Sequence, residues 1–158
     1  MRIYENATSL QREALVAEAV AHVWPLKLIK LPKLAAADFI ALKDGRARSL
    51  IEIKARTTKL DQYPTLMLSM SKAVALKTLT RETGLPSIIV TTLTDRHSNE
   101  CFWYWHKLTD LPLGESYRIE VGGRTDRNDA MDVEPVIMIP YTDFKSGGAV
   151  DFSPVEPP

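Results

Sequence analysis

Asp38, Glu52 and Lys54 are the residues of this sequence whose types and spacing are best suited to chemistry. Strand alternation in the run SLIEIKAR (49–56) places Glu52 and Lys54 on one face, and Ile51 and Ile53 on the other. The apolar, β-branched neighbours predict a central strand covered on both sides. Charges buried there would each lose several kcal/mol of hydration unless a bound cation or a catalytic cleft compensated them. The alternative is a half-exposed strand with a solvated polar face.

Asp38 begins the preceding strand-like run, AADFIALK (36–43), which the turn signal Asp44-Gly45 separates from the next run. If the two strands form a hairpin, the loop length decides which face Asp38 occupies. A three-residue loop sets Asp38 opposite Lys54, with Glu52 on the diagonal, whereas a two-residue turn sends Asp38 to the other face. We therefore predict an odd loop or a compensating β-bulge.

Two carboxylates that converge on one point suit a hard divalent cation such as Mg²⁺ (or Mn²⁺), and the backbone carbonyl of Ile53 offers a third oxygen. Such an ion polarises a phosphodiester and lowers the pKa of a bound water. Lys54 would then position or activate the attacking water, or offset charge on the phosphorus. The chemistry expected of these residues is metal-assisted phosphodiester hydrolysis.

Glu13 has an independent reason to belong to the same site. A helix is predicted from about Ser9 to Trp24, where Pro25 ends it. Glu13 projects near the middle of the apolar face that should pack on the sheet. That face contains Leu10, Ala14, Val16, Ala17, Val20, Ala21, Val23 and Trp24.

The remaining elements are expected to complete an α/β domain over residues 1–150, followed by a loose tail at 151–158 within the Gly- and Pro-rich stretch 147–158. A second helix is predicted from about Ser71 to Thr83, ended by Gly84 and Pro86. The expected order is α-β-β-β-α-β-β with further strands behind it. Its later strand-like runs are 64–70, 87–93, 101–108, 117–121 and 135–141.

Asp38, the Glu52-Ile53-Lys54 triplet fourteen residues later and a preceding helix with Glu13 resemble the PD-(D/E)XK nuclease superfamily. Within it, the chain is most similar to small phage nucleases and archaeal-type Holliday-junction resolvases. The likeness covers about residues 8–95 and 119–140, and it departs from the motif where Ala37 replaces the proline before Asp38. It implies a restriction-endonuclease-like core (αβββαβ), a central mixed sheet flanked by helices, and additional C-terminal β-strands.

The resemblance also implies roles for named residues. Asp38 and Glu52 would bind the metal, Lys54 would be the catalytic lysine, and Glu13 an accessory acid. Lys72 at the start of the second helix would contact the scissile phosphate; the alternative is a lysine that extends into solvent. Candidate DNA contacts are Arg56, Lys59, Arg124 and Arg127, although neighbouring aspartates could simply pair with the last two.

Composition sets limits on the class of protein. The single Cys101 excludes an internal disulfide and a multi-cysteine zinc site. The polar N-terminus predicts no signal peptide, and no apolar run is long enough for a membrane span, so a cytoplasmic protein is expected, in the host cell if a phage encodes it. The formal net charge is zero, but residues 1–60 hold 11 Lys and Arg against 6 Asp and Glu. This basic first part could attract phosphates; the alternative is a charge asymmetry that arises by chance.

The sequence therefore predicts an Mg²⁺-dependent deoxyribonuclease that acts on branched or processed phage DNA, with DNA and a second copy of the chain (a homodimer) as partners. The zero net charge keeps an alternative open, which is an inactive nuclease-fold module that binds DNA or inhibits a host protein. A third hypothesis is a small α/β domain in which the Asp and the Glu-x-Lys are coincidental.

Overall fold

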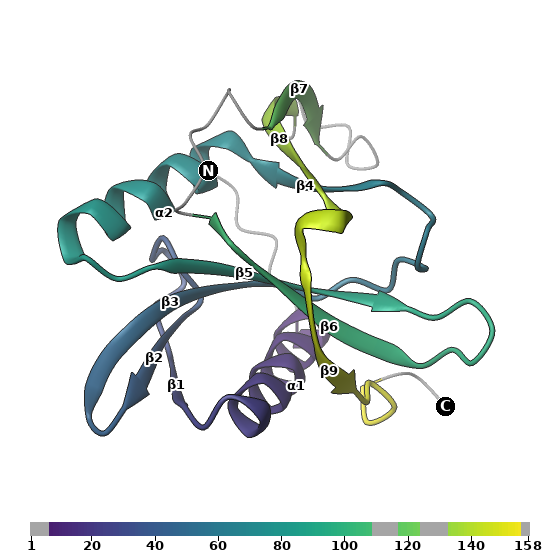
Figure 1. The fold of residues 1–158 in the computed structure, drawn as a ribbon, viewed down its shortest axis with the longest axis horizontal. Coiled ribbons are helices and arrows are strands. Elements are labelled where there is room, and N and C mark those ends of the chain that lie inside the picture. The colour runs from purple at the N-terminus through teal and green to yellow at the C-terminus, as the bar shows by residue number, and fades with distance from the viewer. Residues whose placement is uncertain (1–6, 109–116, 124–132, 156–158) are drawn as a thin grey trace.

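The computed structural model describes residues 7–108, 117–123 and 133–155, and its main layer is a mixed six-stranded sheet (Figure 1). The strand order is β1-β2-β3-β5-β6-β9, in which β3 and β5 pair in parallel and the other neighbours pair antiparallel. The strands are β1 (Lys27–Lys30), β2 (Phe39–Lys43), β3 (Arg46–Lys54), β5 (Ser87–Thr94), β6 (Cys101–Lys107) and β9 (Lys145–Val150).

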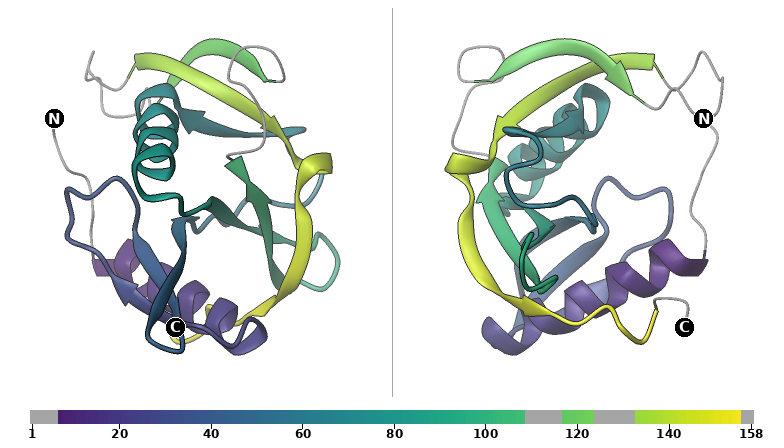
Figure 2. Two further views of the ribbon diagram at one scale, coloured as in Figure 1. Left: turned by 60° about the vertical axis from the view of Figure 1, so that its left-hand side comes forward. Right: turned by 90° about the vertical axis from the view of Figure 1, so that its right-hand side faces the viewer.

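Helices and a second sheet cover the two faces of this layer (Figure 2). Helix α1 (Ala7–Val23) lies on one face. The other face carries α2 (Met70–Thr83) and a three-stranded antiparallel sheet of order β4-β8-β7. Its strands are β4 (Thr65–Ser69), β8 (Val133–Pro140) and β7 (Arg118–Gly123), and a short 3-10 helix (Tyr141–Asp143) follows β8. The predicted restriction-endonuclease-like α/β core, with a mixed sheet, flanking helices and extra C-terminal strands, is confirmed.

Strand β3 supplies alternate residues to two separate hydrophobic cores. Ile51 and Ile53 pack with Val16 and Val20 of α1, whereas Leu50 packs with Leu76 of α2. The strand is therefore covered on both faces, as its apolar, β-branched composition predicts, and the alternative of a half-exposed strand is wrong. Residues 49–53 of the strand are all buried, so the charge of Glu52 is placed in a desolvated environment, whereas Arg46 and Arg48 are exposed.

Two strands of the main sheet were not predicted. Strand β1 has only four residues, KLIK, and three of them are exposed, so it lacks the alternation that marks a half-buried strand. Strand β9, KSGGAV, contains two glycines, a composition more typical of a loop. In the segment that follows β9, Phe152 is only 8% exposed and packs in the α1 core. The loose tail over 151–158 stays a prediction.

None of the helices in the described ranges has the length and apolar character needed to span a bilayer.

Trp103 of β6 is a large side chain in the core between α1 and the sheet. Its side chain is fully buried, and Trp24 lies edge-on to it with ring centroids 5.2 Å apart. Trp105 of the same strand is partly buried and packs against this core. Gly147 of β9 lies against the ring, because a Cβ built at that position would come within 2.2 Å of Trp103 carbon atoms. A side chain at position 147 would have to displace the indole.

We expect Gly147→Ala to lower the free energy of unfolding by about 1–3 kcal/mol, because the added methyl group overpacks the Trp103 ring. Gly148→Ala is the matched control, since a Cβ there would lie 3.2 Å from the nearest indole atom and needs only a small adjustment. Chemical denaturation followed by tryptophan fluorescence measures both. Equal stability of the two variants would contradict this account of the packing.

Candidate active site

A β-bulge in the β2–β3 hairpin decides where Asp38 points. The turn is a two-residue one, Asp44-Gly45, with positive φ at both positions, and it pairs Lys43 with Arg46. By itself it would send Asp38 to the wrong face. The register shifts next to Ala41, where Arg48 is the extra residue of β3, so that Phe39 lies opposite Ile51. The predicted compensating bulge is confirmed, and Asp38 shares the face of Glu52.

Asp38 is fixed to β3 by two hydrogen bonds. Its backbone N–H donates to the carbonyl of Ile51 at 3.1 Å, and its carboxylate Oδ2 accepts from the N–H of Ile53 at 2.8 Å. The N–H and carbonyl of one strand residue point to the same side. The carbonyl of Ile53 is therefore also directed to the side of β3 on which Asp38 lies. This side of the strand brings together one carboxylate and one main-chain oxygen.

Glu52 is a carboxylate in the interior, with only 2% of the residue exposed. Its Oε1 lies 3.0 Å from the Lys54 ammonium and its Oε2 lies 3.4 Å from the Lys72 ammonium. Burial raises the pKa of Glu52 above its ordinary value, and the nearby Asp38 acts in the same direction, whereas the two lysines lower the pKa. Oε2 has no hydrogen-bond partner within the described part of the chain. The site therefore holds a desolvated oxygen suited to a cation.

Lys72 reaches this site from α2. The helix begins after Ser69, whose side-chain oxygen accepts the N–H of Lys72 at 3.4 Å. The Lys72 ammonium then donates to the carbonyl of Ala36 at 3.1 Å, in addition to its ion pair with Glu52. The alternative of a lysine that extends away into solvent is wrong for this structure. Lys72 connects α2, the β1–β2 loop and the buried carboxylate.

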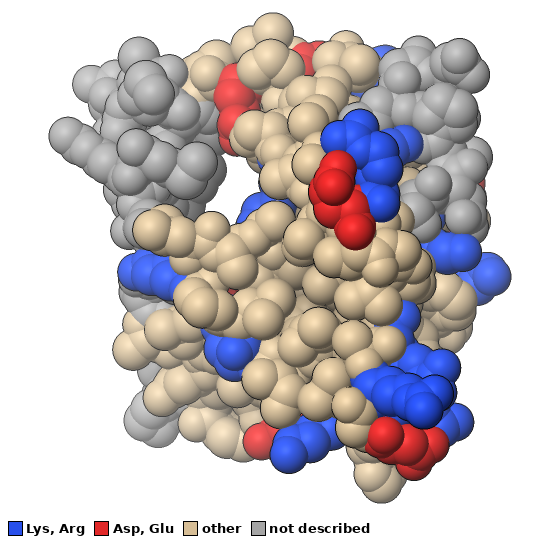
Figure 3. All heavy atoms as spheres, turned by 90° about the vertical axis from the view of Figure 1, so that its left-hand side faces the viewer, with Lys and Arg blue, Asp and Glu red and all other residues tan. Residues whose placement is uncertain are grey.

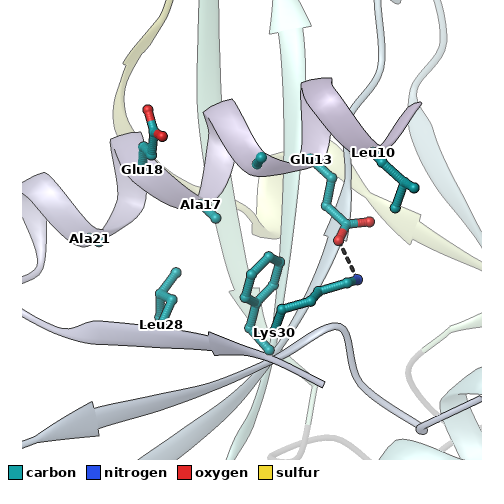
Figure 4. A pocket seen from close by; sticks show the side chains of 9 residues that line it. Leu10, Glu13, Ala17, Glu18, Ala21, Leu28 and Lys30 are labelled. Carbon is teal, nitrogen blue, oxygen red and sulfur yellow. Dashed lines mark hydrogen bonds and ion pairs between the residues drawn. The ribbon is translucent and has the colours of Figure 1, made fainter. Parts of the chain in front are cut away.

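Lys30 at the end of β1 is a site residue that sequence reasoning missed. Its ammonium pairs with Glu13 of α1 (Figure 4). The same ammonium lies 3.7 Å from Oδ1 of Asp38. It also lies above the Phe39 ring, 5.1 Å from the ring centroid. Glu13 therefore joins the site through Lys30, which separates its carboxylate from that of Asp38. Because β1 itself was not predicted, no register placed Lys30 beside Asp38.

A slot of about 430 Å³ continues from this ion pair between α1 and the sheet. In Figure 4, Ala17 and Ala21 of α1 face Leu28 of β1 across it, Glu13 and Lys30 lie at one end, and Glu18 points away. Its walls are mostly apolar. The charges of the site are thus concentrated at the end of the slot nearest Asp38.

The predicted DNA contacts are more dispersed. Arg56 directly follows the β3 segment that carries the site, and its backbone exchanges hydrogen bonds with the hydroxyl of Thr92. Lys59 lies further along and donates to Asn99 Oδ1 at 2.9 Å. Arg124 and Arg127 lie outside the described residues. On the face in Figure 3, basic side chains occur in small groups with acidic ones among them.

Six charged side chains form the site, and their formal charges balance. Glu13, Asp38 and Glu52 oppose Lys30, Lys54 and Lys72. Among the described residues there is no cluster of three or more His, Cys, Asp or Glu side chains placed to hold a metal. A cation here would be held by Asp38, Glu52 and the Ile53 carbonyl, with water in its other positions, which is a donor set typical of Mg²⁺. The Oε2 of Glu52, which is buried and accepts no hydrogen bond within the described residues, fits that role.

Comparison with known proteins identifies the class to which this fold and site belong. Residues 1–147 match the family model described as "phage putative PDDEXK endonuclease", and the chain belongs to this nuclease family. Among solved structures, it is similar to the Holliday junction resolvase Hjc of the archaeal hyperthermophile Archaeoglobus fulgidus, with 16% identity and a TM-score of 0.49. That match covers 84% of this chain and 85% of the resolvase. None of the curated proteins matches the sequence.

We expect Glu52→Gln to stabilise the metal-free protein near neutral pH. A carboxyl whose pKa is raised on folding keeps its proton in the folded state after the unfolded chain has lost it. The free energy of unfolding of the native protein should therefore fall as pH rises from the ordinary value of 4.5 through the raised pKa. Glutamine does not titrate, so the variant should lack this fall.

Urea denaturation in EDTA across about pH 4–8 measures this difference. Glu82→Gln on α2 is the control, because its side chain is 67% exposed and it pairs only with the exposed Arg81 in the described structure. The account would be contradicted if Glu52→Gln were less stable than the native protein at the upper end of this range.

Proposed function

We propose that this protein is a divalent-metal-dependent endodeoxyribonuclease whose site is built on Asp38, Glu52, Ile53 and Lys54. The observation that carries the proposal is the buried Glu52 carboxylate beside Asp38, whose Oε2 accepts no hydrogen bond within the described residues although Lys72 lies 3.4 Å away, in a chain of the PDDEXK endonuclease family. An isolated buried carboxylate is unfavourable unless it is compensated, and metal binding is a usual compensation. Branched or processed phage DNA is the substrate class we propose.

The chain's own residues would divide the work as follows. Asp38, held by the Ile53 N–H, and Glu52 would bind Mg²⁺ or Mn²⁺ together with the Ile53 carbonyl. When bound, such an ion lowers the pKa of a water and polarises the phosphodiester. Lys54, oriented by Glu52, would position the attacking water or offset charge on the phosphorus. Lys72, held by Ala36 and Glu52, would contact the scissile phosphate.

Electrostatics favours phosphate binding only once the metal is present. The six charged side chains sum to zero, so a divalent ion would leave the site with two positive charges. A phosphodiester carries one negative charge and gains another as the transition state forms. A protein with zero net charge can therefore still attract its substrate locally.

The direct test measures metal binding and cleavage separately. We expect Mg²⁺ or Mn²⁺ to raise the melting temperature of the native protein, since a ligand at 100 times its Kd adds about 2.7 kcal/mol to stability. Asp38→Asn and Glu52→Gln should lose this shift. Lys54→Ala should keep the shift and lose cleavage by roughly 10²–10³-fold. Glu18→Gln, which removes a carboxylate that points away from the slot, should change neither.

Cleavage is measured on a supercoiled plasmid and on a synthetic four-way junction. Equal activity of the native protein and the Glu52 and Lys54 variants would contradict the proposed site. A metal-induced shift with DNA binding but no cleavage would favour an inactive DNA-binding module instead. Homodimer formation, which the resemblance to resolvases implies, stays a prediction, and light scattering of the purified chain measures it.

A further inference from the structure

The loop between β1 and β2 presents an exposed leucine close to the candidate site. Pro32, Lys33 and Leu34 form its exposed tip, and Leu34 is 79% exposed. Both ends of the loop are packed. Leu31 contacts the hydrophobic core that contains Leu76 of α2, and Ala37 is 2% exposed within the same core. The loop therefore presents an exposed apolar residue from a packed base.

Hydrogen bonds give this loop a defined shape. The N–H of Ala35 donates to the carbonyl of Pro32 at 2.8 Å, which closes a tight turn with Lys33 and Leu34 at its centre. The N–H of Leu31 donates to the carbonyl of Asp38 at 2.8 Å and closes the base. Lys72 holds the loop from the side through its hydrogen bond to Ala36. Two residues of the candidate site thus also hold the loop.

The distance from the loop tip to the site matches the scale of DNA. Leu34 is four residues from Asp38, so their Cα atoms are at most about 14 Å apart. Successive phosphates of one strand follow the duplex axis at about 3.4 Å each. A DNA strand that ran from Asp38 and Glu52 toward the loop tip would therefore reach Leu34 within about four nucleotides of the scissile phosphate.

A single exposed leucine is ordinary on a protein surface. Leu34 differs because it lies at the tip of a loop that two residues of the site hold in place. Asp38 accepts a hydrogen bond from Leu31 at the base of the loop, and Lys72 donates one to Ala36. Apolar side chains such as leucine enter base steps in many DNA-binding proteins, where they partly unstack the bases and kink the duplex. Lys33 beside it adds a positive charge where the backbone would pass.

We propose that Leu34 is a wedge that enters the base stack of the DNA substrate a few nucleotides from the cleaved bond. This inference rests on the proposed nuclease function and deepens it. Unstacking a base step costs a few kcal/mol and costs least where pairing is already interrupted. The wedge therefore makes the enzyme favour DNA that opens easily beside the cleavage position, as it does at a branch point.

The test compares Leu34→Ala with Val121→Ala, a control on β7 in the second sheet whose residue is 74% exposed. Substrates are a four-way junction, a paired duplex, and the same duplex with a two-base mismatch within about four nucleotides of the cleaved bond, where Leu34 would enter. We expect Leu34→Ala to lower kcat/KM about tenfold on the two fully paired substrates, equivalent to about 1.4 kcal/mol. On the mismatched duplex, which needs no wedge, the loss should be less than about twofold.

A second readout does not depend on cleavage. 2-Aminopurine at the branch point of the junction becomes more fluorescent when its base is unstacked. In EDTA, at protein concentrations that saturate binding by anisotropy, native protein and Val121→Ala should raise this fluorescence, and Leu34→Ala should not. Equal melting temperatures of the three proteins would show that Leu34→Ala acts on the DNA rather than on folding.

The outcomes separate the two proposals. If the native protein binds or cuts DNA and Leu34→Ala behaves the same on every substrate, the wedge is wrong and the proposed function stands. An equal loss on all three substrates also overturns the wedge, because it indicates a contact that ignores base stacking. If the native protein cuts no DNA but 2-aminopurine responds through Leu34, the wedge stands and the nuclease activity does not. If it binds no DNA, both proposals fail.

Discussion

The Glu52 carboxylate is a charge in the middle of a sheet that is covered on both faces, and much of the structure around it serves to hold that charge. Lys54 pairs with it from the same strand and Lys72 from α2, while burial still raises its pKa. The position of α2 is thereby tied to β3 by electrostatics as well as by the apolar contacts of Leu50 and Leu76. A destabilised charge at a fixed position is a common way in which proteins trade stability for a functional site.

The balance of charges explains how an electrically neutral chain could act on a polyanion. Three carboxylates and three ammonium groups meet where α1, β1, β3 and α2 approach one another. Lys30 keeps the carboxylates of Glu13 and Asp38 from repelling each other in the absence of metal. On this view attraction for DNA is local and conditional on the ion, so a broad basic surface is not needed.

The sequence was informative where physical constraints are local. Alternation in 49–56 identified a strand buried on both sides. The even sequence separation of Asp38 and Glu52 required either an odd loop or the bulge that the structure contains. Gly84 ends α2 as expected, with a positive φ and a hydrogen bond to Thr80. The family membership and the α/β core followed from the same few residues.

What the sequence did not reveal depends on tertiary contacts. Strand β1 is too short and too exposed to show a period, so Lys30 had no predicted neighbour. Strand β9 is glycine-rich because Gly147 must clear the Trp103 ring, a reason that exists only in the folded protein. The reach of Lys72 to Ala36 likewise requires the β1–β2 loop and α2 to be packed together. Arg124 and Arg127 lie outside the described residues and stay predictions.

The single extra residue at Arg48 has a consequence for how this hairpin can change over time. Asp38 and Glu52 are separated by an even number of positions, which a two-residue turn alone cannot place on one face. Loss of Arg48 together with the bulge would shorten the interval by one and leave Asp38 opposite Glu52, whereas loss of one residue elsewhere in the hairpin, with the bulge kept, would rotate the two carboxylates to opposite sides of the sheet. Related chains are therefore free to change the hairpin length by one residue only if the bulge is gained or lost at the same time. Length variation that looks neutral in a sequence comparison would be functionally coupled to the presence or absence of the bulge.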